Sequence, residues 1–213
     1  MLALLRLCSE NVVRRESGQI SNCRVLAHPP EPVLAIHGSW VGGVLRLHAQ
    51  GTYHETAGAA ALGLPVDRGT SWWAFPAAVA PAPAALTDVR LQRPFEHGAS
   101  TYCGASAWEL LDAARASASE LTLRASSEIA DLLSAEPLRP ALRVESADRQ
   151  APGAPTAVKA TLCFEATRTG TGTGVRFEAG ELSAAVERGE RSVRRGKTWY
   201  RVNPQDLLQA QAA

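Results

Sequence analysis

Basic and aromatic residues interleave in the segment RSVRRGKTWYRVNPQDL, which lies near the C-terminal end of the chain. Arginine and lysine side chains can neutralise phosphates, and an indole ring can stack on a nucleic-acid base. Glu187 and Glu190 offset only part of the local positive charge. The segment therefore predicts a nucleic-acid contact, with these candidate residues: Arg188, Arg191, Arg194, Arg195, Lys197, Trp199 and Arg201. The competing interpretation is a solvated hairpin that keeps Trp199 and Val202 in the core.

Four histidines, His28, His37, His48 and His54, lie close together in the first part of the chain. A zinc site needs three or four converging ligands, and the HExxH and HxH spacings are absent. Strand alternation puts His48 on the same face as Arg46, which we expect to face water. We therefore expect hydrogen-bonded or solvated histidines and neither a metal nor another cofactor.

Other residue types that could do chemistry lack the context that the chemistry needs. Ser39 follows Gly38 without a GxSxG elbow, and Cys103 and His97 have no third group to orient them. The glycine-rich segment RTGTGTG, residues 168–174, lacks the lysine of a phosphate loop and precedes a strand, so it predicts a hairpin turn. With no ATPase, hydrolase or metal motif, we expect no enzymatic activity.

Composition limits the class of protein. The chain has 213 residues, 46% of them hydrophobic, which is enough for one large domain or two small ones. A net charge of +1 predicts no nucleic-acid or membrane attraction for the chain as a whole, so any such contact must come from local clustering. Cys8, Cys23, Cys103 and Cys163 are scattered and are expected to pack as small apolar residues. No apolar run is long enough to span a membrane, and we expect a cytoplasmic protein.

Hydrophobic periodicity predicts an α+β fold, with β-hairpins near both ends and a few short helices between them. Strands are expected at 33–36 and 44–50, at 158–167 and 175–180, and on either side of Arg195-Gly196. Helices are expected at 105–118, at 126–135, at 179–189 and from Pro204 onward, the last one capped by Asn203. The order of helix, basic hairpin and helix near the C-terminal end resembles the wing of a winged-helix domain.

Composition along the chain predicts three regions: a β-rich region at 1–75, a linker at 76–92 and an α+β region with the basic hairpin at 93–213. The linker is expected because PAAVAPAPAALTD is almost purely proline and alanine at its start. Trp72, Trp73 and Phe75 precede this linker. We expect this aromatic cluster to form core, and the alternative is a protein–protein interface.

Three segments, in order along the chain, resemble the N-terminal accessory region of bacterial Swi/Snf-family helicases, which are of the DEAD/DEAH type. VLAIHGSWVGGVLRLHAQ, residues 33–50, resembles their opening hairpin, although His48-Ala49-Gln50 departs from it. RPFEHG resembles their His-Pro-Phe element, with Arg93 in place of histidine. LSAAVERGERSVRRGKTWYRVNPQDLLQA resembles the segment before their motor; the residues in register are Val193, Arg194, Gly196, Trp199, Val202, Pro204 and Leu207.

This resemblance implies a noncatalytic accessory module whose partners are DNA or RNA and a separate helicase motor subunit. The Walker lysine motif and the DExH box of the motor are absent from the sequence. The resemblance also implies that IHGSW is a structural turn, in which His37 forms a hydrogen bond and Trp40 packs. The alternative function is a protein-interaction or structural domain that does not contact nucleic acid.

Overall fold

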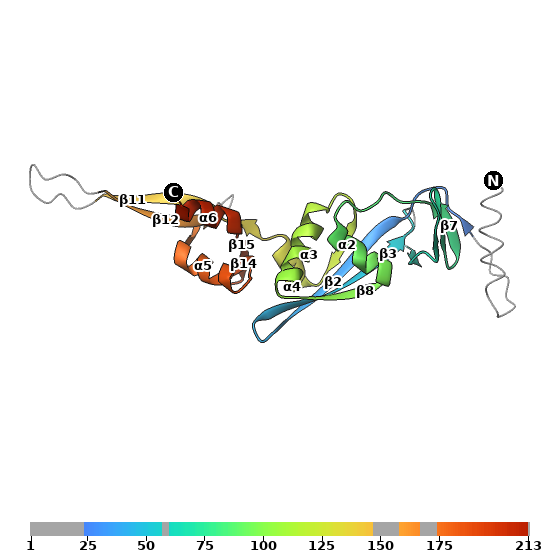
Figure 1. The fold of residues 1–213 in the computed structure, drawn as a ribbon, viewed down its shortest axis with the longest axis horizontal. Coiled ribbons are helices and arrows are strands. Elements are labelled where there is room, and N and C mark those ends of the chain that lie inside the picture. The colour runs from blue at the N-terminus through green and yellow to red at the C-terminus, as the bar shows by residue number, and fades with distance from the viewer. Residues whose placement is uncertain (1–23, 57–59, 147–157, 167–173, 213) are drawn as a thin grey trace, which may run out of the picture. The chain divides into compact units, whose positions relative to one another are not determined.

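The computed structural model of the chain describes residues 24–56, 60–146, 158–166 and 174–212 (Figure 1). It is mixed α+β, which confirms the predicted fold class. The chain divides into two compact units, residues 1–129 and 130–213. This division differs from the predicted one, which placed a linker at 76–92 between two regions.

The N-terminal unit is built on a long antiparallel hairpin. Strands β2 (Glu31–Val41) and β3 (Val44–His54) pair along their whole lengths. Gly42 and Gly43 form the turn with φ values of 59° and 79°, which a two-residue hairpin turn of this kind requires. Strand β9 (Thr122–Ala125) runs parallel to β2, and strands β8 (Ala99–Cys103) and β4 (Ala61–Gly63) both pair with β3. The result is a five-stranded sheet.

Helices α2 (Val89–His97) and α3 (Ala105–Ala116) cover one face of this sheet (Figure 1). The strand residues on that face are buried: Leu34, Ile36, Leu45 and Leu47 are at most 1% exposed. Trp40 packs on the same face, with its ring centroid 6.0 Å from that of Trp108. The expected packing of Trp40 is confirmed, but IHGSW lies inside β2 and not in a turn.

Helix α2 was not predicted, because its sequence contains Pro94, which normally ends a helix. Asp88 begins the helix: its carboxylate accepts a hydrogen bond from the backbone N–H of Arg90 at 2.9 Å. The helix backbone lies close to β3 at Gly51. A Cβ atom there would be 2.7 Å from the carbonyl carbon of Pro94, so only glycine permits this approach.

A second, smaller sheet in the N-terminal unit has the order β1-β7-β6-β5. Its strands are β1 (Arg24–Val25), β5 (Asp67–Arg68), β6 (Trp72–Phe75) and β7 (Ala78–Pro81). The linker prediction for residues 76–92 is therefore wrong, because that range holds β7 and the start of α2. Pro76 occupies the turn and Pro81 the end of β7, where proline is tolerated, and the small residues 78–80 are fully buried.

Tyr53 joins the two sheets through an aromatic cluster. Its ring centroid lies 5.5 Å from Trp73, 5.8 Å from Phe75 and 5.3 Å from Phe95. Phe75 is 2% exposed, so the expectation that this aromatic segment contributes to the core is confirmed for Phe75. Arg68 lies over the Trp73 ring, 5.1 Å from its centroid, and donates a hydrogen bond to the Phe95 carbonyl at 2.8 Å.

Because Tyr53 is buried, we expect the stability of the N-terminal unit to depend on pH in the alkaline range. Burial raises the pKa of the Tyr53 hydroxyl, and the nearby Arg68 opposes this only in part. As pH rises, the Tyr53 hydroxyl of the unfolded chain loses its proton at about pH 10, whereas the folded chain keeps the proton to higher pH. The free energy of unfolding therefore falls as pH rises above about 10. We expect Tyr53→Phe to reduce this loss, measured by urea unfolding across the alkaline range. Equal pH slopes for the two proteins would show that Tyr53 does not contribute.

The C-terminal unit contains two three-stranded sheets, in the orders β10-β15-β14 and β11-β12-β13. The strands are β10 (Glu136–Pro137), β11 (Arg139–Ser146), β12 (Val158–Ala166), β13 (Val175–Glu178), β14 (Ser192–Arg195) and β15 (Thr198–Arg201). The helices are α5 (Ala179–Glu187) and α6 (Pro204–Ala212), and α4 (Ser127–Leu133) spans the boundary between the units.

The core of the C-terminal unit lies between these sheets and helices. It includes Phe164, Phe177, Leu182, Tyr200 and Leu207, each at most 3% exposed. The predicted helices at 105–118, 126–135 and 179–189 correspond to α3, α4 and α5. Asn203 caps α6 as predicted, since its side-chain oxygen accepts a hydrogen bond from the Gln205 N–H at 3.1 Å. The predicted turn at 168–174 lies almost entirely outside the described residues, between the antiparallel strands β12 and β13.

Candidate nucleic-acid interface

The basic segment near the C-terminal end forms the predicted hairpin, β14 paired with β15. The turn is Gly196-Lys197, one residue later than expected, and Gly196 has the positive φ of 64° that favours glycine. This position of the turn sets Arg194 directly opposite Trp199. Turn position therefore decides which basic side chain meets the indole ring.

One face of the hairpin contributes to the core. Val193 and Tyr200 are opposite each other and buried, and the Tyr200 ring lies 5.4 Å from that of Phe177. The competing interpretation placed Trp199 and Val202 in the core. Val202 is buried, at 2% exposed, but Tyr200 is the buried aromatic residue and Trp199 is only half-buried.

Arg195 lies at the edge of this core face and is bound within the chain. It donates hydrogen bonds to both carboxylate oxygens of Glu181, at 3.1 and 2.8 Å. Its guanidinium lies over the Phe177 ring, 4.3 Å from the centroid, and it donates to the backbone carbonyl of Arg176. These contacts neutralise its charge and fix its position, so Arg195 is better described as a structural residue of the hairpin than as a phosphate ligand.

Two more candidates also have contacts within the chain. Arg188 donates to both carboxylate oxygens of Glu190, at 3.0 and 3.1 Å, and this pair raises the pKa of the guanidinium. Arg191 is half-buried before β14, and its carbonyl accepts a hydrogen bond from the Val202 N–H at 3.0 Å. Neither residue belongs to the strands of the hairpin.

The opposite face of the hairpin carries the remaining four candidates. Strand alternation puts Arg194, Trp199 and Arg201 on this face, and Lys197 is exposed in the turn. The Arg194 guanidinium lies 5.7 Å from the centroid of the Trp199 ring. Among the described residues, no carboxylate forms an ion pair with Arg194, Lys197 or Arg201. We call Arg194, Lys197, Trp199 and Arg201 the outward hairpin face.

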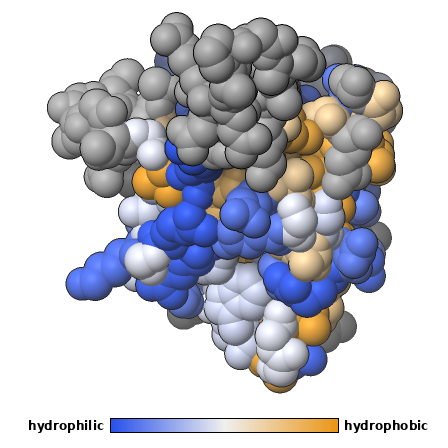
Figure 2. Space-filling model, turned by 90° about the vertical axis from the view of Figure 1, so that its left-hand side faces the viewer, coloured by the Kyte–Doolittle hydropathy of each residue, from blue (hydrophilic) through white to orange (hydrophobic). Residues whose placement is uncertain are grey.

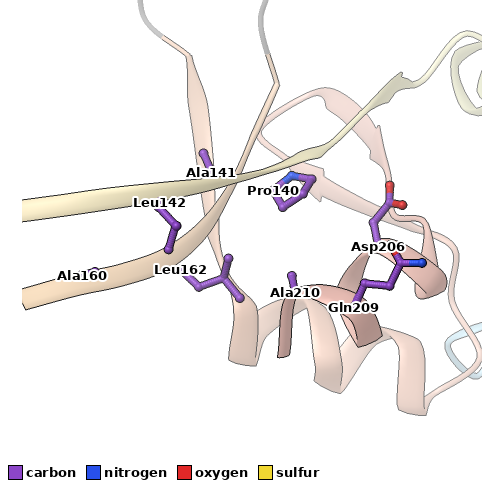
Figure 3. A pocket seen from close by; sticks show the side chains of 8 residues that line it. All are labelled: Pro140, Ala141, Leu142, Ala160, Leu162, Asp206, Gln209 and Ala210. Carbon is purple, nitrogen blue, oxygen red and sulfur yellow. The ribbon is translucent and has the colours of Figure 1, made fainter. Parts of the chain in front are cut away.

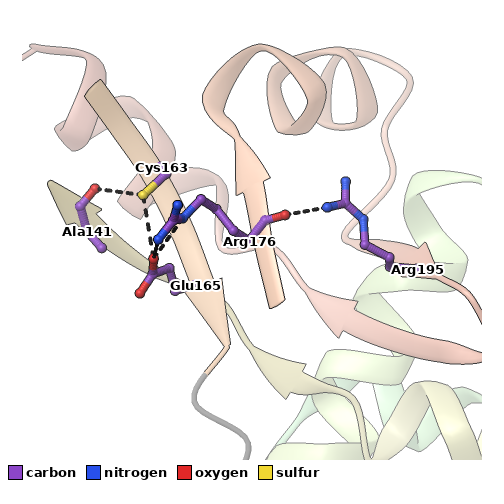
Figure 4. Close-up of polar contacts among 5 residues, drawn as sticks. All are labelled: Ala141, Cys163, Glu165, Arg176 and Arg195. Atoms are coloured by element: carbon purple, nitrogen blue, oxygen red, sulfur yellow. Dashed lines mark hydrogen bonds and ion pairs between the residues drawn. The ribbon is translucent and has the colours of Figure 1, made fainter. Parts of the chain in front are cut away.

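In the sheet of order β11-β12-β13, several polar side chains form hydrogen bonds within the chain (Figure 4). Arg176 donates to Glu165 at 2.9 and 2.6 Å, and the thiol of Cys163 donates to the Ala141 carbonyl at 3.4 Å.

Cys163 is 3% exposed, which agrees with the expected packing of cysteines. Cys103 is exposed and differs from that expectation, whereas Cys8 and Cys23 lie outside the described residues.

The histidines of the first part of the chain differ in their surroundings. His37 and His48 are cross-strand neighbours on the open face of the five-stranded sheet, and both are exposed. His54 is buried, at 8% exposed. Within the described ranges no group of three or more histidine, cysteine or acidic side chains could hold a metal ion. His97 ends α2 and Cys103 ends β8, and in the described part of the chain no hydrogen bond joins their side chains.

Comparisons of the chain with family models, with curated proteins and with solved structures found no match. The resemblance to the accessory region of Swi/Snf-family helicases therefore stays a prediction. Among the helices of the described residues, none has the length and apolar character needed to cross a bilayer.

Proposed function

We propose that the chain is a noncatalytic module that contacts nucleic acid through its outward hairpin face. The observation that carries this proposal is that Arg194 lies over Trp199, Arg201 shares its face of the hairpin and Lys197 is exposed in the turn, all three cations without carboxylate partners in the described residues. Cations of this kind can neutralise phosphates, because no internal ion pair must first be broken. The half-buried indole can stack on an unpaired base beside them.

The proposed contact leaves out the remaining arginines of the segment, Arg188, Arg191 and Arg195. Arg188 and Arg195 are each held by a carboxylate, Glu190 and Glu181 respectively. Binding a phosphate would require them to give up that partner. The proposed site thus contains only four of the seven residues that the sequence predicts.

Trp199 provides the first test of this site. We expect Trp199→Ala to weaken binding of a single-stranded oligonucleotide by about 1–3 kcal/mol, the usual contribution of one base stacked on an aromatic ring. Trp199→Phe should retain most of the affinity, because a phenyl ring also stacks. Affinity is measured by titration with a fluorescent oligonucleotide. Unchanged binding by Trp199→Ala would remove base stacking from the proposal.

We further propose that this module works with a separate helicase motor subunit. Support comes from the order of the three segments that resemble the accessory region of Swi/Snf-family helicases. The third of these segments forms helix α5, the hairpin of β14 and β15, and helix α6. A module of this kind would hold nucleic acid and leave ATP hydrolysis to its partner.

A further inference from the structure

A groove in the C-terminal unit lies between β11, β12 and α6 (Figure 3). Its volume is about 600 Å³, and most of its lining is apolar, with Asp206 and Gln209 as its polar side. Seen from the side of this unit, the molecule shows hydrophobic surface next to hydrophilic surface (Figure 2). A carboxylate in an apolar lining repels phosphates, so this groove does not extend the nucleic-acid contact.

The five-stranded sheet of the N-terminal unit has a second surface of different chemistry. Along β3, exposed residues alternate with buried ones from Val44 to Gly51, and helices α2 and α3 lie over the buried set. The ladders with β2, β8 and β9 continue the exposed set on the opposite side of the sheet. We call its central positions the open sheet face: His37, Ser39, Arg46, His48, Gln50, Thr101, Cys103 and Arg124.

The basic side chains of the open sheet face follow one diagonal. His37 and His48 are directly opposite each other, and Arg46 lies two residues from His48 on β3. Arg124 of β9 is opposite Ala35, which is two residues from His37 on β2. With about 4.8 Å between strands and about 3.4 Å per residue, the Cα atoms of the two arginines are about 16 Å apart. This diagonal passes over His37, with His48 beside it.

None of the side chains on the open sheet face is a carboxylate. Among the described residues, no ion pair or side-chain hydrogen bond involves the two arginines or the two histidines of this face. Glu31 lies on the same side of β2, but it is six residues from His37 and opposite His54. A group of unpaired basic side chains without acidic neighbours attracts a polyanion.

We propose that the open sheet face binds a single-stranded stretch of nucleic acid that crosses β9, β2 and β3. Arg124 and Arg46 neutralise phosphates at the two ends of the diagonal. The exposed rings of His37 and His48 provide a surface between them on which unpaired bases stack. This inference rests on the proposed function, because the class of ligand is the same, and it adds a contact on the other unit of the chain.

The chemistry of this face favours a single strand over a duplex or a bilayer. A duplex keeps its bases stacked on one another, so the imidazole rings would have no base to receive. Binding to a bilayer depends on apolar side chains that enter it. The side chains beside the imidazoles are instead polar, namely Ser39, Gln50 and Thr101, and they offer hydrogen bonds to base edges. The exposed apolar residues Val41 and Val44 lie at the turn of the hairpin.

The test is a titration of the full chain with a fluorescent single-stranded oligo(dT) over a range of salt concentration. Replacing Arg46 and Arg124 by glutamine should lower the slope of log affinity against log salt by about 1.4, because two phosphate contacts are lost. The matched control replaces Arg90 and Arg115, which belong to α2 and α3 and are already paired with aspartates. It makes the same change in net charge and should keep the wild-type slope. Arg46 and Arg124 are exposed, so the sheet variant should also keep the wild-type unfolding midpoint.

The imidazole rings are tested in a separate pair of variants. Replacing His37 and His48 by alanine should weaken binding of oligo(dT) at least about fivefold, since a stacking surface is removed. Replacing both by phenylalanine should retain the affinity, because a phenyl ring also stacks. Unchanged affinity of the alanine variant would contradict stacking on the open sheet face.

The salt slopes distinguish this inference from the proposed function when compared with the variant that has glutamine at positions 194, 197 and 201. A wild-type slope in the sheet variant and a lowered slope in the hairpin variant would overturn this inference and leave the proposed function intact. A lowered slope in the sheet variant alone would support the open sheet face and contradict the hairpin contact.

A second ligand tests the class of partner. Vesicles of phosphatidylcholine and phosphatidylserine should not bind through Arg46 and Arg124. Vesicle binding that needs both arginines, without binding of oligo(dT), would overturn the inference in favour of a membrane surface. Binding of neither ligand at low salt would overturn this inference together with the proposed function.

Discussion

Replacing Arg194, Lys197 and Arg201 by glutamine is expected to abolish most of the salt-sensitive binding of nucleic acid. Each cation that contacts a phosphate contributes about 0.9 to the slope of log affinity against log salt for duplex DNA, and about 0.7 for a single strand. Removing three should therefore lower that slope by about 2 to 3. The measurement is a series of binding titrations of wild type and variant over a range of salt concentration.

The matched control changes the same net charge at arginines that are already paired. Arg115, Arg176 and Arg188 form ion pairs with Asp112, Glu165 and Glu190. Glutamine at these three positions should leave the affinity and the salt slope close to the wild-type values. If this control weakens binding as much as the hairpin variant does, binding depends on the overall charge and the outward hairpin face is not the site.

Phe95→Ala is expected to have the largest effect on stability, a loss of about 3–5 kcal/mol in the free energy of unfolding of the N-terminal unit. Phe95 is 2% exposed, and its ring lies 5.3 Å from Tyr53 in the aromatic cluster. Its removal leaves a cavity where α2 meets β3, close to Gly51. The loss is measured by urea unfolding followed by tryptophan fluorescence.

The placement of the tryptophans makes this measurement specific. Of the five tryptophans, only Trp199 belongs to the C-terminal unit, so a Trp199→Phe background reports the N-terminal unit alone. Val89→Ala is the control, because Val89 lies on the same helix and is 73% exposed. It should change stability by no more than about 0.5 kcal/mol. Similar effects of the two substitutions would contradict the described position of α2.

Elements with strong local signals could be predicted from the sequence. The β2–β3 hairpin follows from alternation around Gly42-Gly43, and α3 follows from the helical spacing of Trp108 and Leu111. Asn203 followed by Pro204 marks the start of α6 for reasons of backbone geometry alone. In each case the local preference and the tertiary packing agree.

Elements whose stability comes from distant partners could not be predicted. Strand β7 consists of alanine, valine and proline and reads as a linker, yet it is buried because β6 pairs with it and β1 lies beside it. Helix α2 contains Pro94, and its position depends on the contact of Phe95 with Tyr53 and on the close approach to Gly51. Composition within a short window carries no information on such contacts.

The candidate site shows the same limit. The sequence predicts a window of seven residues, but it does not show that Glu181 holds Arg195 or that Glu190 holds Arg188. Pairing across the hairpin then separates Arg194 and Trp199 from the core face. A local signal for the pairing of Arg194 with Trp199 was Gly196. The first position of this turn has a positive φ, which favours glycine, so Gly196 could have fixed the turn and hence the register.

The measurement that tests the central claim most directly is a fluorescence-anisotropy titration of the wild-type chain with single- and double-stranded DNA and RNA. It is made at low and at near-physiological salt. Contact through the outward hairpin face predicts binding at low salt that weakens steeply as salt is added. No binding to any of these nucleic acids at low salt would contradict the proposed function and favour a protein-interaction or structural domain.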